Sequence, residues 1–312
     1  MDRFSLCLSI AITQARTSVS WPFLFVVNSE HQAMKWALIN GPLVTFLQQN
    51  EFSTLRRANY RFIGMSSYKT FPRPESEDSL DYETVCEGWC HCFRSPENFL
   101  FSSIPRALIS HSDFTDHQRI SPLTALQTAP DERFDVVYVG SENEWKKGTK
   151  NWALAAKCIP LLCRHLNLRV LVIGTPTDDF PSEPGICFCP SLPWERLLMH
   201  IAAARCVFVP NVVDASPRVI AEALCLNTPV VVNRHILGGW KYVNRFTGTF
   251  FEDQHDIVSA VRTCINQAVE PRSWFCTNFG PYLAGRQLLR FLTSIDPQIN
   301  ERSHVWLSEQ SH

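Results

Sequence analysis

One short polar stretch of the chain carries residue types that suit anion binding. Ser216 followed by Pro217 is typical of a helix start, with serine as the N-cap and proline at the first helical position. Free backbone N–H groups and the helix dipole attract anions at such a start, and the guanidinium of Arg218 adds donors that suit phosphate. Two carboxylates, Asp214 and Glu222, flank this start. The structural alternative is that Asp214 only complements the helix dipole and that Glu222 faces solvent.

The elements that must position these residues follow from the pattern of apolar residues in the second half of the chain. Short apolar runs, typical of buried parallel strands, alternate with helical spacings of 10 to 18 residues. The runs predict strands over 134–140, 168–174, 207–210 and 229–232, and the spacings predict helices over 149–166, 193–205, 216–226 and 254–268.

This alternation predicts a doubly wound α/β domain with a parallel sheet covered on both faces. Such sheets bind ligands at the carboxyl ends of their strands. The loops of interest are therefore those after Gly140, Gly174, Pro210 and Val232.

The first 130 residues are less regular. The apolar runs there predict strands at 23–27, 60–64 and 106–110. They also predict a helix over 31–48 that is broken around Gly41 and Pro42. The polar, proline-rich composition of two segments predicts a surface loop at 71–82 and a linker at 111–133.

Composition excludes several classes of protein. Among 312 residues, 29 Lys and Arg face 30 Asp and Glu, so the net charge of −1 argues against a general binder of nucleic acid or anionic membranes. No apolar run reaches the ~18 residues that a membrane span needs. The apolar stretch 4–12 is short, follows an acidic residue and lacks a cleavage site, so we do not expect a signal peptide. The twelve cysteines are spread through apolar segments, which favours a reduced, cytoplasmic protein.

A set of short motifs occurs in one order along residues 134–292. These motifs are Tyr138-Val139-Gly140, Lys147-Gly148, Asp214-x7-Glu222, Thr228-Pro229-Val230, Gly238-Gly239, Thr247-Gly248 and Glu252-Asp253. The ordered set resembles the donor-binding half of the GT-B glycosyltransferases of family four, the glycosyl transferases of group 1. The resemblance implies a GT-B-like fold of two Rossmann-type α/β domains with parallel sheets, the N-terminal one short or degenerate.

The resemblance also implies roles for individual residues. Asp214 and Glu222 would form the catalytic pair, with Asp214 on the donor sugar and Glu222 on the ribose hydroxyls. Lys147 would contact the diphosphate, and the amides around Ser216 would hold phosphate or sugar groups. Donor-binding residues are then expected at Gly140, Lys147, Lys150, Ser216, Arg218, Gly238 and Gly239.

Two positions depart from the family pattern. Ser141 stands where the family carries a second diphosphate-binding arginine, a role for which Lys146, Lys150 or Arg218 are the substitutes in this chain. Asp214 replaces a glutamate and is one methylene shorter. Either change is compatible with a different donor or with lost activity.

The resulting domain prediction is a reduced acceptor-side domain over 1–130, a donor-binding domain over 131–292 and a C-terminal tail over 293–312. We expect transfer of a hexosyl group from a nucleoside-diphosphate sugar to a hydroxyl acceptor (glycan, lipid or protein) with retention, without a metal or other cofactor. A catalytically inactive, nucleotide- or sugar-binding relative is the alternative, and a sugar-nucleotide epimerase is a third. We expect no nucleic-acid partner, no transmembrane segment and a cytoplasmic location, with peripheral membrane attachment left open.

Three other groups of residues are weaker candidates for a metal or catalytic site. Cys86, Cys90, His91 and Cys92 are close enough in sequence to suggest zinc, but without a second paired cluster a packed apolar segment is the favoured interpretation. For His111, which is followed by Asp113, and for His235, structural roles in loops are favoured over catalysis.

Overall fold

The chain forms two compact units. One consists of Met1–Phe114 with Pro281–His312, and the other of Thr115–Gly280. The computed structural model describes residues 21–30, 32–73, 78, 80–122, 132–174, 180–299 and 304–308. The domain boundaries expected at 130 and 292 lie later on the chain than the divisions between these units, because the helix that begins at Pro281 packs in the first unit.

The second unit, Thr115–Gly280, contains a six-stranded parallel sheet of order β11-β10-β9-β6-β7-β8. Its strands are β6 (Val136–Val139), β7 (Val170–Ile173), β8 (Ile186–Cys189), β9 (Cys206–Val209), β10 (Val230–Asn233) and β11 (Gly248–Phe251). The chain runs outward from β6 through β7 to β8, and then returns to β9 on the other side of β6. Strand order therefore reverses between β6 and β9, where doubly wound sheets bind ligands.

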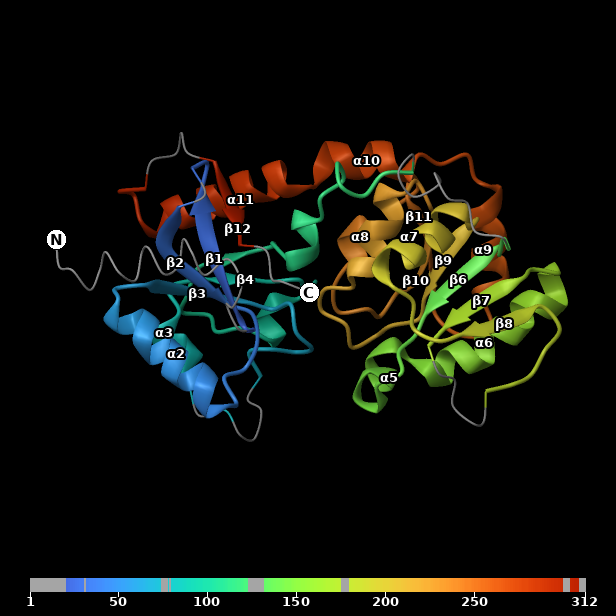
Figure 1. Ribbon diagram of the computed structural model, residues 1–312, viewed down its shortest axis with the longest axis horizontal. Helices are drawn as coiled ribbons and strands as arrows, with labels where there is room; N and C mark the ends of the chain where they lie inside the picture. Colours follow the sequence, from blue (N-terminus) through green and yellow to red (C-terminus); the bar gives the residue numbers. More distant parts are fainter. Residues whose placement is uncertain are drawn as a thin grey trace. The chain divides into compact units, whose positions relative to one another are not determined.

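Helices cover both faces of this sheet (Figure 1). The helices of the unit are α5 (Glu144–Lys150), α6 (Trp152–Leu166), α7 (Trp194–Ala203), α8 (Arg218–Cys225), α9 (Ile257–Asn266) and α10 (Pro271–Asn278), with a 3-10 turn η3 at Trp240–Tyr242. Apolar residues of α7, α8 and α10 share one buried cluster with strand residues, and those of α6 and α9 share a second cluster. Alternate residues of the strands enter the two clusters, as the period of a strand requires.

All four strands and all four helices predicted for this half are present, with ends that differ by a few residues. The structure adds β8 and β11, which pattern reasoning did not identify as strands. β8 lies at one edge of the sheet and leaves Phe188 42% exposed, so it lacks the continuous burial that made the central strands recognisable.

The first unit has a mixed sheet of order β12-β1-β2-β3-β4-β5. Its strands are β1 (Phe23–Asn28), β2 (Ala33–Ile39), β3 (Arg61–Met65), β4 (Trp89–Cys90), β5 (Arg106–Ala107) and β12 (Val305–Leu307). β1 pairs antiparallel with both β2 and β12, and the remaining pairs are parallel. The GT-B-like prediction of α/β units with parallel-dominated sheets is confirmed.

Helices α2 (Phe46–Arg57) and α11 (Pro281–Ile295) lie on opposite faces of this sheet (Figure 1). Leu288 and Leu292 of α11 pack against Leu24 of β1 and Ile63 of β3 in one buried cluster. On the other face, the ring of Phe52 in α2 contacts Phe62. Shorter helical segments are α3 (Tyr82–Val85), η1 (Pro96–Asn98) and η2 (His111–Phe114).

The helix predicted over 31–48 is wrong. Residues 33–39 form strand β2, and the helix in this region, α2, begins at Phe46. From Trp36 to Ile39 every side chain is buried because both faces of this inner strand are covered, and a continuous apolar run does not distinguish a buried strand from a helix. Thr45 caps α2 through a reciprocal capping box with Gln48, a helix-start pattern that was present in the sequence.

Several predictions fall wholly or partly on residues outside the described ones. These are the apolar stretch 4–12, parts of the loop 71–82 and the linker 111–133, and most of the tail after Ile299. None of the helices in the described part of the chain has the length and apolarity that a membrane span requires.

Candidate functional site

The loops after β6 and β9 lie next to each other at the reversal of strand order in the second unit. Gly140 ends β6 and donates its N–H to the carbonyl oxygen of Ile173 at 2.8 Å. A Cβ atom at Gly140 would lie 2.2 Å from Cζ2 of Trp152, so only glycine fits between the strand end and the indole. Asn151 has a left-handed backbone conformation. Its side-chain Nδ2 donates to the carbonyl oxygen of Pro210 at 3.0 Å and so links the two loops.

Lys150 and Asp214 form an ion pair across this junction. Nζ of Lys150 lies 3.7 Å from Oδ2 of Asp214, with side-chain exposures of 21% and 13%. The hydroxyl of Tyr138 on β6 donates to the carbonyl oxygen of Lys150 at 2.9 Å. Burial raises the pKa of the Tyr138 phenol, so the hydroxyl remains a donor. The strand therefore fixes the backbone from which Lys150 reaches Asp214.

The Asp214 carboxylate also organises its own loop. Oδ2 accepts a hydrogen bond from Nδ2 of Asn211 at 2.7 Å, and Oδ1 accepts one from the N–H of Ser216 at 3.3 Å. The carbonyl oxygen of Asp214 accepts a bond from the N–H of Gly238 at 2.9 Å, which joins the loop after β9 to the loop after β10. The sequence predicted Asp214, Ser216 and Gly238 as site residues, and the structure brings all three together.

Helix α8 begins one residue later than the sequence predicted. Pro217, not Ser216, takes the N-cap position, and Arg218 is the first residue of the helix. Pro217 makes no side-chain capping bond, and proline is tolerated there because the N–H that it lacks would have no partner within the helix. Gly239 has φ +79°, and a Cβ there would lie 2.7 Å from Cγ of Pro217, so the loop after β10 closes tightly on the helix start.

Glu222 lies on α8 and is 9% exposed. Its Oε1 accepts a hydrogen bond from the indole Nε1 of Trp194 at 3.0 Å. Trp194 is the first residue of α7, which follows the carboxyl end of β8. The solvent-facing alternative for Glu222 is wrong, because α7 and α8 pack on the same face of the sheet and enclose its carboxylate.

The remaining predicted cations lie on the elements that flank this junction. Lys147 is on α5, one turn before Lys150, and Arg218 is exposed at the first position of α8. Sequence reasoning missed Trp194, Asn211 and Asn151. A tryptophan or an asparagine gives no motif by itself, and only the contacts of these side chains with Glu222, Asp214 and Pro210 reveal their part in the site.

The structure also shows the surroundings of other sequence candidates. Within the described residues, no group of three His, Cys, Asp or Glu side chains is placed to hold a metal ion. Cys86, Cys90 and Cys92 are buried, and burial raises the pKa of the Cys86 thiol, as expected for a packed apolar segment. His235 is exposed and its Nε2 lies 3.4 Å from Oε1 of Glu252.

The architecture of the chain defines its fold class. A parallel sheet with a reversal in strand order and a second α/β unit are features of the GT-B fold, and the similar structures named below share that fold. Residues 133–267 match the model of the family described as "Glycosyl transferases group 1". The predicted resemblance, strongest in the second half of the chain, is confirmed.

Three of the similar structures illustrate the likeness. AviGT4, a glycosyltransferase involved in avilamycin A biosynthesis, is 18% identical with a TM-score of 0.50, covering 80% of this chain and 71% of that chain. TarM is 13% identical with a TM-score of 0.55, and the match covers 83% of this chain but only 54% of that chain, so this chain spans about half the length of TarM. Anabaena Alr3699/HepE in complex with UDP-glucose is 14% identical with a TM-score of 0.55, covering 82% and 78%.

These identities show a shared fold. No curated protein matches the chain.

Proposed function

We propose that the protein is a retaining glycosyltransferase that moves a hexosyl group from a nucleoside-diphosphate sugar to a hydroxyl acceptor. The observation that carries the proposal is the junction between β6 and β9. There Lys150 pairs with Asp214 and α8 begins, and the buried carboxylate of Glu222 lies one turn into α8, all within the residues that match the glycosyltransferase family.

Each group has a role that its chemistry supports. The Glu222 carboxylate accepts hydrogen bonds from the ribose hydroxyls. Lys147, Lys150 and Arg218 supply positive charge to the diphosphate, and the amides at Ser216 and the start of α8 add oriented N–H donors. Gly140 in the loop after β6, and Gly238 and Gly239 in the loop after β10, are the glycines that would present backbone groups to the donor.

The proposed reaction needs no protein base. The acceptor oxygen forms a bond to the anomeric carbon on the face from which the bond to the diphosphate oxygen breaks, and the acceptor proton passes to the departing phosphate. Negative charge grows on that phosphate, which is where fixed cations and a helix N-terminus lower the barrier most. Asp214 contacts the donor sugar in this proposal, and the side chains supply the charge without a metal ion.

The first test is binding of UDP, GDP, ADP and their sugars, measured by thermal shift and calorimetry. UDP-glucose leads the panel because the HepE structure was solved with it. A ligand at 100 times its Kd adds about 2.7 kcal/mol of stability, which raises Tm by several degrees. We expect Glu222→Ala to abolish the shift, whereas Glu195→Ala, an exposed carboxylate on α7, leaves it unchanged. Absence of any shift with a folded sample would contradict the proposal.

Two observations favour a second function, a binding protein without turnover. Both carboxylate oxygens of Asp214 are engaged, by Asn211, Lys150 and Ser216, and Ser141 stands where the resemblance implies an arginine. The two functions differ in what happens to a bound donor. A transferase hydrolyses its sugar nucleotide slowly or transfers it with retention, which NMR of the anomeric proton detects, whereas a binding protein leaves it intact.

A further inference from the structure

The carboxylate of Glu222 is held at one of its two oxygens. Nε1 of Trp194 donates to Oε1 at 3.0 Å, and within the described residues no donor reaches Oε2. A hydrogen bond to an ionised acceptor is stronger than one between neutral groups, so it holds the carboxylate in one orientation. With one bond to Oε1, this oxygen keeps one acceptor position and Oε2 keeps its full acceptor capacity, so the carboxylate can accept from two hydroxyls of a ligand.

Trp194 is itself restrained. It begins α7, whose Leu198 and Ile201 pack in the same buried cluster as Val219 and Ile220 of α8. This packing fixes the two helix starts against each other and therefore sets the distance between the indole and Glu222.

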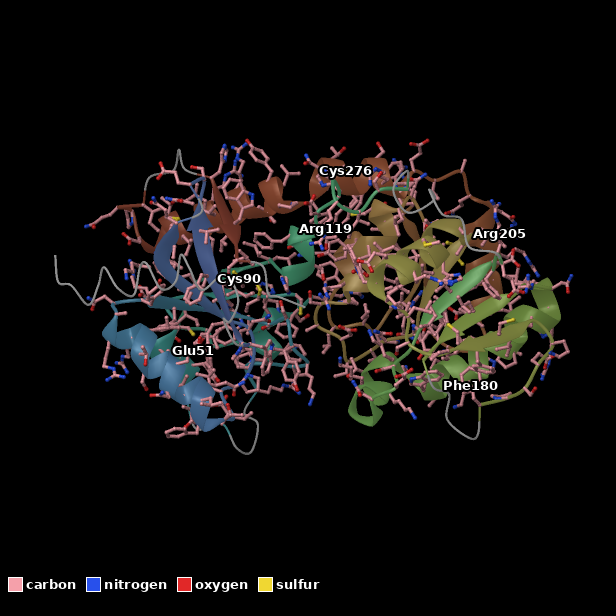
Figure 2. All side chains as sticks on the ribbon, viewed as in Figure 1. Glu51, Cys90, Arg119, Phe180, Arg205 and Cys276 are labelled. Atoms are coloured by element: carbon pink, nitrogen blue, oxygen red, sulfur yellow. The ribbon has the colours of Figure 1, made fainter. Side chains whose placement is uncertain are left out.

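A charge also covers one face of the indole. The guanidinium carbon of Arg119, labelled in Figure 2, lies 5.1 Å from the centroid of the Trp194 ring. A cation over an aromatic face is attracted to the ring. The ring is thus held by the helix at its backbone, by Arg119 at its face and by Glu222 at its N–H.

We propose that Trp194 is a positioning residue that fixes the Glu222 carboxylate for two ribose hydroxyls, and so makes the site selective for ribonucleotides over deoxyribonucleotides. The inference rests on the proposed function, because it takes Glu222 as the ribose-binding group. A freely rotating carboxylate would still accept hydrogen bonds, but it would lose orientation entropy at each binding event. A ligand without the hydroxyls makes no use of this orientation.

The experiment compares Trp194→Phe with the parent protein, using UDP, GDP and ADP and their 2′,3′-dideoxy counterparts as probes in calorimetry. Phenylalanine keeps an aromatic ring but has no N–H. We expect the affinity for the bound ribonucleotide to fall by about tenfold, while the affinity for its dideoxy counterpart stays within about threefold. In turnover of the donor, KM should rise with kcat nearly unchanged, as for a group that contributes equally to ground-state and transition-state binding.

Two further variants separate positioning from packing. In Trp194→His the ring nitrogen Nε2 occupies the same ring position as the indole nitrogen, so the preference for ribonucleotides should return in part. Trp274→Phe is the matched control: this indole in α10 contacts Phe279, and the change should leave the preference intact. Far-UV circular dichroism and thermal unfolding verify that each variant is folded.

The outcomes distinguish this inference from the function on which it rests. If the parent binds no nucleoside diphosphate, or if Glu222→Ala leaves the ribonucleotide preference intact, the proposed role of Glu222 fails. If Glu222→Ala removes the preference but Trp194→Phe keeps it, or weakens both ligands equally, the role of Trp194 alone is overturned.

Discussion

The two sheets have the same number of strands but are assembled from the chain in different ways. The second unit is one continuous segment of the chain. The first unit is completed only when the end of the chain returns: β12 pairs with β1, and the N–H of Ser308 donates to the carbonyl oxygen of Phe25 at 2.8 Å. Local patterns therefore describe the second unit well and the first unit poorly.

Two polar groups, one from each unit, illustrate different surroundings. In the first unit, Nε1 of Trp89 donates to Oγ of Ser66 at 2.7 Å, and that hydroxyl donates to the carbonyl oxygen of Phe71. These groups are buried and neutral, and they satisfy each other. In the second unit, charged side chains such as Lys150 and Asp214 link two loops and stay partly exposed. Of these two groups, only the Lys150–Asp214 pair is charged; the first unit also carries partly exposed charges, which Arg61, Glu87 and Asp296 form with one another.

The largest expected effect tests whether the returning helix holds the first unit together. Leu288 of α11 is 0% exposed within the core of that unit. Leu288→Ala should lower the free energy of unfolding by about 2–5 kcal/mol, because it removes buried methyl groups and leaves a cavity. Urea unfolding measures the change. Leu47→Ala, at a side chain that is 75% exposed, should change it by less than about 0.5 kcal/mol. Equal effects of the two substitutions would contradict the assignment of α11 to this core.

The next prediction compares a carboxylate from each unit. Asp113 is 0% exposed and accepts a bond from the N–H of Ser110 at 2.9 Å, whereas Asp214 is joined to Lys150 and Asn211. Alanine at either position should cost about 1–3 kcal/mol, because donors lose their partner. Only Asp214→Ala should also slow donor hydrolysis, by at least about tenfold.

Calorimetry and a hydrolysis assay with UDP-glucose separate these two roles. A loss of hydrolysis with Asp113→Ala, at unchanged folding, would break the contrast between the units.

The smallest effect concerns buried thiols of the second unit. Burial, aided by the negative charge of Glu183, raises the pKa of Cys163 from 9.0 to about 11, and burial raises that of Cys158 to about 12. A raised pKa in the folded state means that the protonated thiol is favoured by folding. Its contribution is therefore complete below pH 9 and is lost as the pH rises from 9 to 11.

Urea unfolding at a series of pH values measures this decline. Cys163→Ala should flatten the fall in stability between pH 9 and 11, whereas Cys276→Ala, at a partly exposed thiol of the same unit, should flatten it less. An identical slope in both variants and the parent would show that Cys163 does not contribute.

The sequence predicted the elements whose pattern is complete within a few neighbouring residues. Strands β6, β7, β9 and β10 were recognisable because each is a buried run bounded by a turn residue. The segment 33–39 is buried without interruption only from Trp36 to Ile39 and shows no clear alternation, and the sequence pattern predicted a helix there. No local sequence pattern shows that a strand will pair with strands on both sides, since those strands come from other parts of the chain.

Some residues of the candidate site were predictable from sequence motifs, and others only from contacts in the tertiary structure. Asp214, Ser216 and Gly238 were predicted individually from motifs, and the structure joins them. Lys150 was one of several cations that could serve the site, and only the hydrogen bond from Tyr138 and the path of α5 select it as the partner of Asp214. Trp194 carried no signal before α7 and α8 were packed together.

The sequence by itself determined the chemical groups and the local frame: two carboxylates eight residues apart, cations on both sides, glycines where the backbone needs room, and strands that alternate with helices. Tertiary structure decided which groups meet. It paired Lys150 with Asp214, gave Glu222 the indole of Trp194, and brought α11 and β12 back to complete the first unit. The reason is physical: secondary structure depends on neighbours along the chain, whereas these contacts join residues that only strand order and helix packing bring together.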